Sequence, residues 1–148
     1  MKCTDDGKSI IEAPDVIRFR SGGEFIWDHE VYVSQVVPHL FDGCGNLHNP
    51  IHTSPKAAKA VGLPGNIVHG TWTLSTAVRE VLDQEGGGDP ERLKRVQCRF
   101  SDMVLPDSTI TVRLLGKTET DDNTEYHFEV LNSSGKRALR DGHVILAK

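Results

Sequence analysis

The chain has 148 residues, a length that suits one domain with its own hydrophobic core. Hydrophobic residues make up 37% and charged residues 26%, which excludes a disordered chain, and a formal net charge of -4 leaves no basic field for nucleic acid. There is no signal-peptide core and no run of about 18 apolar residues, so we expect no membrane partner and a cytoplasmic location. The three cysteines, an odd number, suit that reducing compartment.

The first residues differ in composition from the rest of the chain. Residues 1–23 are polar and end in Ser21-Gly22-Gly23, so they are predicted to form an extension with a short strand at Val16 to Phe19. The domain itself is predicted to span residues 24–148. From Glu24 to Val37, aromatic and β-branched residues predict one or two strands, with extended structure up to Pro38.

The stretch from His39 to Gly70 is rich in glycine, histidine and proline. This composition suits neither a long helix nor a regular strand, and it predicts a functional loop region. Within it, Ser54-Pro55 is an N-cap followed by a first-turn proline, so a short helix is predicted there. Gly62 and Pro64 are expected to end it.

The longest helix is predicted for Thr71 to Glu85, where apolar residues recur every three or four positions until Gly86-Gly87-Gly88. The C-terminal third instead alternates with period two around residues 110–114, 126–130 and 144–146, which predicts antiparallel strands. One helix with strands before and after it predicts an α+β domain, a curved antiparallel sheet wrapped around a long central helix. A single hotdog fold fits this order, and periodicity alone leaves a ferredoxin-like arrangement open.

The run from Phe41 to His52, FDGCGNLHNPIH, resembles the hydratase-2 motif of MaoC-like proteins, in which an aromatic leads to Gly-Asp-x-Asn-Pro-Ile-His. Gly62-Leu63-Pro64 and Ile67-Val68-His69-Gly70 fall where that family has its Gly-x-Pro and Ile-x-His-Gly elements. The resemblance covers about residues 24 to 148. It implies a hotdog fold, usually a dimer of hotdogs, and the reversible addition of water to the double bond of an enoyl thioester on coenzyme A or a carrier protein. No cofactor and no metal are expected.

That chemistry needs a base to activate water, an acid for the α-proton and donors for the thioester oxygen. The resemblance assigns the base to His52, which Pro50 and the helix start at Ser54-Pro55 hold in place. Gly70 begins the long helix, where free N–H groups favour developing negative charge, so its N–H is the expected oxyanion donor. Asn49 and His69 are expected to contribute to substrate binding. A histidine that only bridges a loop, and a glycine that only admits the chain to a helix, are the alternatives.

The chain departs from the motif at one position. The family's catalytic Asp lies five residues before its His, and that position is Leu47, which cannot transfer a proton. Asp42 or His48 is therefore predicted to act as the second titrating group, unless the substrate needs only one base. The incomplete pair also leaves two other functions open. One is an altered hotdog protein that binds or differently processes an acyl or polyketide-like ligand, and the other is an interaction module.

The same loop allows two further interpretations, a metal site and a cysteine nucleophile. Cys44, His48 and His52 with His39 have the residue types of a metal site, but the glycines and Pro50 prevent the continuous helix that would align them. The second interpretation is that Cys44 acts as a nucleophile beside His52.

Overall fold

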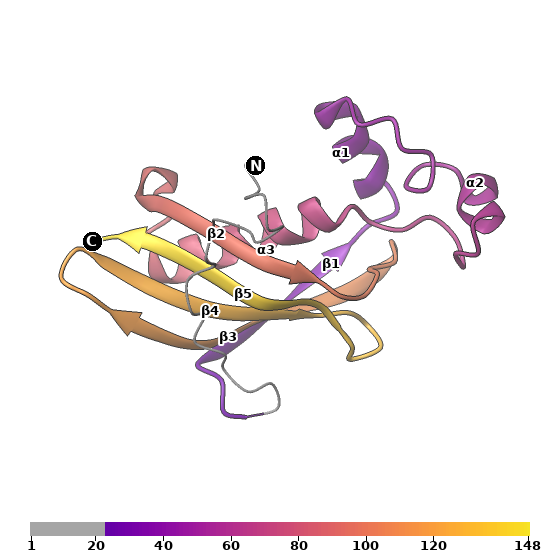
Figure 1. Cartoon of the computed structure of the whole chain (residues 1–148). Coiled ribbons are helices and arrows are strands. Elements are labelled where there is room, and N and C mark those ends of the chain that lie inside the picture. Colours follow the sequence, from indigo (N-terminus) through magenta and orange to yellow (C-terminus); the bar gives the residue numbers. More distant parts are fainter. Residues whose placement is uncertain (1–22) are drawn as a thin grey trace, which may run out of the picture.

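The computed structural model describes residues 23–148, and the strand predicted at residues 16–19 lies outside this part. A five-stranded antiparallel sheet in the order β1-β3-β4-β5-β2 curves along one long helix, α3 (Figure 1). The α+β hotdog prediction is thus confirmed. The elements are β1 Trp27–Val33, α1 Val37–Gly45, α2 Pro55–Ala60, α3 Gly70–Glu85, η1 Pro90–Arg92, β2 Leu93–Phe100, β3 Ser108–Glu119, β4 Asn123–Leu131 and β5 Arg137–Ala147.

The predicted period-two alternation sets which face of the sheet is buried. On β3, Ile110, Val112 and Leu114 are fully buried, and on β4 so are Phe128 and Val130. Val112 pairs with Val130, and Phe128 pairs with Gly142 of β5. A β-carbon at Gly142 would lie 2.5 Å from the Phe128 carbonyl oxygen, so glycine is required for the close approach of these strands.

The helix α3 begins one residue before the predicted start and ends at the predicted Glu85. Its inner face carries Ala77, Val78, Val81 and Leu82, which are buried against the sheet. The predicted apolar spacing therefore does bury one stripe of the helix. Within residues 23–148, none of the helices has both the length and the hydropathy needed to span a bilayer.

The helix α1 was not predicted. Extended chain was predicted up to Pro38 and a loop from His39 onward, but the structure has one strand, β1, and then a helix at Val37–Gly45. Pro38 occupies the first turn, where its missing N–H costs no hydrogen bond. The ring of Phe41 packs on His69 with centroids 5.1 Å apart. This tertiary contact compensates for the low helix propensity of Gly43.

The short predicted helix is confirmed as α2, with Ser54 as its N-cap. The Ser54 hydroxyl accepts a hydrogen bond from the Ala57 N–H at 3.3 Å. Gly62 follows with a φ of 84°, a conformation that ends the helix at little cost for glycine. Both α1 and α2 lie beyond the N-terminal end of α3 (Figure 1).

Candidate active site

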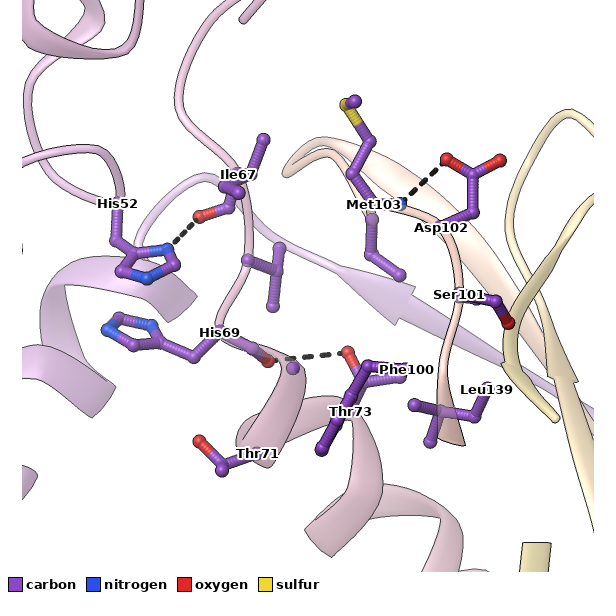
Figure 2. Close-up of a pocket in the computed structure, with 14 residues that line it drawn as sticks. His52, Ile67, His69, Thr71, Thr73, Phe100, Ser101, Asp102, Met103 and Leu139 are labelled. Atoms are coloured by element: carbon purple, nitrogen blue, oxygen red, sulfur yellow. Dashed lines mark hydrogen bonds between the residues drawn. The ribbon is translucent and has the colours of Figure 1, made fainter. Parts of the chain in front are cut away.

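His52 is held by a tight loop that leads into α2. The His52 N–H donates to the Asn49 carbonyl at 3.2 Å, and the Ser54 N–H donates to the Pro50 carbonyl at 2.8 Å. Nδ1 of His52 lies 2.7 Å from the carbonyl oxygen of Ile67 (Figure 2). A carbonyl only accepts, so Nδ1 carries the proton and Nε2 of the neutral ring has a free lone pair. The ring is therefore oriented as a base.

The segment that carries His69 is fixed on both sides. The Val68 N–H donates to the Val104 carbonyl at 2.8 Å, and the Ile67 N–H donates to the Ile51 carbonyl at 3.3 Å. His69 then places its ring against that of His52, with centroids 3.7 Å apart and planes inclined by 25° (Figure 2). Two residues separated by a helix in sequence thus form one stacked pair.

The environment of His69 favours its neutral form. The side chain is 5% exposed, and Nε2 lies 3.6 Å from Oδ1 of Asp42. Burial lowers the pKa of His69, and the neighbouring His52 lowers it further, while Asp42 acts in the opposite direction. The Asp42 side chain is 13% exposed. A carboxylate and two imidazoles therefore meet at the junction of α1, the His52 loop and the start of α3.

The N-terminus of α3 opens beside this junction. His69 is the N-cap residue, and it makes no side-chain capping bond to the helix. The first N–H groups of a helix have no intrahelical acceptor, so the Gly70 N–H can donate to a ligand. A β-carbon at Gly70 would lie 2.7 Å from Cδ1 of Phe100. Glycine is needed here because the Phe100 ring packs directly on the backbone.

These groups border one cavity of about 530 Å³, a size typical of small-molecule sites. Its polar end carries His52, His69 and Gly70. The rest of the wall is mostly apolar and comes from the segment before α3, the end of β2 with its following loop, and β5 (Figure 2). The apolar members are Ile67, Val68, Phe100, Met103, Val104, Ala138 and Leu139. The cavity thus combines a basic and donating end with an apolar body.

The other predicted residues lie behind or outside this cavity. Asp42 contacts His69 but is not part of the cavity wall. His48 has a side chain that is 73% exposed, and its Nδ1 is 4.0 Å from Oδ2 of Asp42. Asn49 is exposed, and its Oδ1 accepts from the Ile51 N–H at 3.3 Å, which shapes the loop. Leu47 is 49% exposed and packs over Gly45.

Three contributions escaped the sequence analysis. The Ile67 carbonyl that orients His52, the Phe41 ring on His69 and the Phe100 ring on Gly70 all depend on contacts between distant segments. The leading aromatic of the motif was the only available signal, and it pointed to Phe41. In the described residues, no three of Cys44, His48, His52 and His39 come close enough to share a metal ion.

Comparisons with known proteins agree on one family. The family model described as "MaoC like domain" matches residues 28–136. A probable enoyl-CoA hydratase 2 of Dictyostelium discoideum is 38% identical over 102 residues, which is 69% of this chain and 31% of that protein. A fatty acid synthase beta subunit of Emericella nidulans is 48% identical over 67 residues, 45% of this chain and 4% of that protein. The chain therefore spans less than a third of either relative.

A solved structure supports the same grouping. The full-length peroxisomal multifunctional enzyme type 2 of Drosophila melanogaster superposes with a TM-score of 0.79 at 26% identity. The match covers 95% of this chain and 25% of that chain. The likeness is therefore not confined to the motif around His52.

Proposed function

The chain belongs to the MaoC-like family of hydratases and dehydratases, and on that premise we propose that it adds water to, or removes water from, an enoyl or 3-hydroxyacyl thioester. In the hydration direction, the water oxygen bonds to the β-carbon and the α-carbon gains a proton. The double bond is replaced by these two new bonds, and the thioester oxygen carries negative charge in between.

One observation carries the proposal: His52, whose Nδ1 is bound to the Ile67 carbonyl, and the start of α3 border the same cavity. His52 accepts the proton of the attacking water through Nε2 and returns it to the α-carbon, so that the ring is neutral again at the end of the reaction. The Gly70 N–H, at the positive end of the helix dipole, stabilises the enolate-like oxygen. The apolar wall from Phe100, Met103 and Leu139 accommodates the acyl chain. The substrate is proposed to be carried on coenzyme A or a carrier protein, with no cofactor in the reaction.

The second titrating group is proposed to be Asp42, which acts on the cavity through His69 and not by contact with the substrate. Its Oδ1 lies 3.6 Å from Nε2 of His69, which stacks on the base, and the carboxyl is largely buried. His48 is much more exposed, so its imidazole faces solvent rather than the site. His69 links Asp42 to the cavity and, with Asn49 fixing the loop, orients His52 toward the substrate.

A homodimer is part of the proposal. Gly70, Phe100 and Met103 line the cavity and are also exposed, so a second subunit has an open wall to cover. Light scattering of the purified chain measures this state directly. The cytoplasmic location stays a prediction, since the similar Drosophila enzyme is named as peroxisomal.

A second candidate function follows from Leu47, which has no ionisable group and lies outside the cavity wall. In this second function, the chain binds an acyl ligand or processes it differently, and it has no hydratase activity. The Leu47→Asp substitution separates the two functions: hydration that appears only in this variant would support the second candidate.

The main test is the hydration of crotonyl-coenzyme A, followed by the loss of enoyl thioester absorbance. His52→Ala should lose about 10²–10⁴-fold in kcat, the range that general base catalysis contributes. His39→Ala is the matched control, because His39 is exposed and lies outside this cavity. Equal activity of the wild type and His52→Ala would refute the role of His52.

A further inference from the structure

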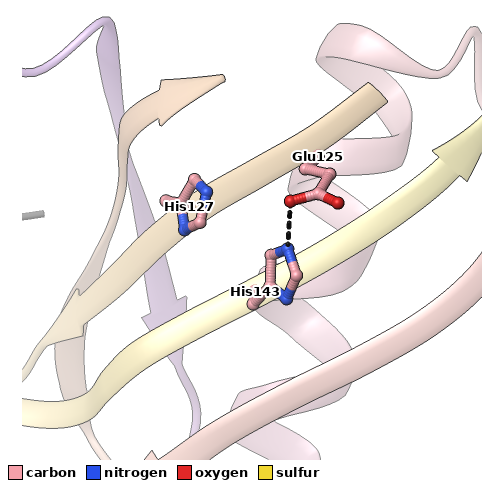
Figure 3. Close-up of side chains that lie close together, drawn as sticks. All are labelled: Glu125, His127 and His143. Carbon is pink, nitrogen blue, oxygen red and sulfur yellow. Dashed lines mark hydrogen bonds and ion pairs between the residues drawn. The ribbon is translucent and has the colours of Figure 1, made fainter. Parts of the chain in front are cut away.

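A second group of titratable side chains lies on the face of the sheet that points away from α3. On β4, Tyr126 and Phe128 belong to the core, so Glu125 and His127, at the alternate positions, point to the opposite face. His143 of β5 is the cross-strand partner of His127 and stands beside it. Figure 3 shows the three side chains on these neighbouring strands.

The three side chains are close enough to share one ligand. One nitrogen or oxygen from each residue lies within 4.8 Å of the others. Nε2 of His143 is 3.2 Å from Oε2 of Glu125, and the rings of His143 and His127 are stacked with centroids 4.9 Å apart (Figure 3). Among residues 23–148, this is the one such set of three His, Cys, Asp or Glu side chains.

Both histidines are buried, at 4% and 9% exposure for His127 and His143. A neutral imidazole nitrogen offers the lone pair that a metal ion binds, and histidine is the commonest metal ligand in proteins.

Of the two carboxylates on this face of β4, Glu125 is the one that belongs to the group with His127 and His143. Glu129 lies two residues farther along the same face, but its Oε1 is 3.4 Å from an Arg113 guanidinium nitrogen. Arg113 therefore offsets the charge of Glu129, whereas Glu125 faces His143. On β3, the residue paired with His127 is Gly116, which contributes no side chain.

We propose that Glu125, His127 and His143 bind one divalent transition-metal ion of the zinc class. Two imidazole nitrogens and one carboxylate oxygen form a donor set that zinc takes, whereas magnesium and calcium prefer oxygen ligands alone. Ligand atoms about 2.0–2.1 Å from a tetrahedral ion are about 3.3 Å apart. The Glu125 to His143 contact already has about this separation. A ligand nitrogen of His127 lies within 4.8 Å of both.

This site differs from the expectation of no metal, which considered only the loop around Cys44, His48 and His52. Its position on the far side of the sheet separates it from the cavity that His52 and Gly70 line. A bound ion would join β4 to β5 and stabilise the fold. The inference is therefore independent of the proposed hydratase function.

The test is calorimetric titration of the full chain with Zn²⁺, in a Cys3→Ser/Cys44→Ser background because thiolates also bind zinc. One equivalent should bind and raise the Tm with metal concentration. Glu125→Gln, His127→Gln and His143→Gln should each weaken binding by at least about 10–100-fold, since even the loss of a group that only supports a ligand costs this much. Mg²⁺ should not bind at this site.

His29→Gln is the matched control, because His29 forms a similar pair with Glu80 at 3.3 Å but belongs to no group of three possible ligands in the described part of the chain. Its affinity for Zn²⁺ should equal that of the parent. Equal affinity in the three cluster variants, or no Zn²⁺ binding by the parent, would overturn the proposal. If a buried variant does not fold, histidine side-chain NMR of the parent decides: Zn²⁺ must shift His127 and His143, and shifts confined to exposed His39 and His48 would refute the site.

Discussion

The imidazole rings of His52 and His69 are stacked with their centroids 3.7 Å apart, although 17 positions separate the two residues in sequence. Two protonated rings at this distance would repel each other. The pKa of His69 is lowered by burial and, next, by the neighbouring His52. This arrangement gives the site a pH dependence.

Stability should fall in mild acid because of His69. Its pKa in the folded protein lies below the ordinary value of 6.5, so the unfolded chain binds more protons here. The contribution of the neutral ring is fully present above about pH 6.5 and is lost as the pH falls through the folded pKa. His69→Gln should therefore reduce the fall in Tm between about pH 7 and pH 5. Thermal unfolding at constant ionic strength measures this, with His39→Gln as the control for the substitution itself.

Asp42 is expected to matter more for catalysis than His48. Asp42→Asn removes the ionisable group but keeps the shape, and it should lower kcat by about 10²–10⁴-fold. His48→Gln should have a much smaller effect, because the His48 side chain is 73% exposed. Steady-state hydration of crotonyl-coenzyme A compares the two. The reverse order of effects would assign the role of second titrating group to His48.

Gly70→Ala should disturb the cavity through Phe100. The new β-carbon would lie 2.7 Å from Cδ1 of the Phe100 ring, which must move. Because this ring lines the cavity, kcat/KM should fall by about tenfold, equivalent to about 1.4 kcal/mol. The added Phe100→Ala substitution should restore part of this loss by making room. Full activity of the single variant would show that the ring does not set the shape of the site.

Gly142→Ala should destabilise the sheet. The β-carbon would meet the Phe128 carbonyl oxygen at 2.5 Å and the Phe128 ring at 2.7 Å, and both are buried. We expect a loss of about 2–3 kcal/mol in the free energy of unfolding, within the range of overpacking. Gly43→Ala is the matched control, since it meets nothing within 4 Å and lies in α1. It should be neutral or stabilising by up to about 1 kcal/mol in urea unfolding.

Regular elements of this fold follow from local sequence. The spacing of apolar residues in α3 and their alternation in β3 and β4 each bury one face, so the patterns were sufficient. The helix α1 was missed because Pro38 and Gly43 lower the helix propensity of its sequence. It also depends on the contact between Phe41 and His69. Long-range packing of this kind has no local signal.

Strand register limited what could be predicted about the histidine cluster. Leu131 pairs with Arg137 beside the turn, and a regular hairpin from there would put His127 opposite Asp141. Two register shifts between Phe128 and Leu131 instead align His127 with His143. Bulges of this kind are decided by packing across the sheet, so the local sequence could not align His127 with His143.

The position of Asp42 on a helix has a consequence for how the site can be altered. A carboxylate on α1 moves with the whole helix as one rigid body, and that body is docked on His69 by Phe41. The Phe41→Ala substitution would thus act indirectly. It would shift the carboxylate of Asp42 away from His52 and His69 without removing any ionisable group from the chain. The electrostatics of the histidines are in this sense controlled by an aromatic contact, and hydrophobic repacking alone could tune the protonation of the site.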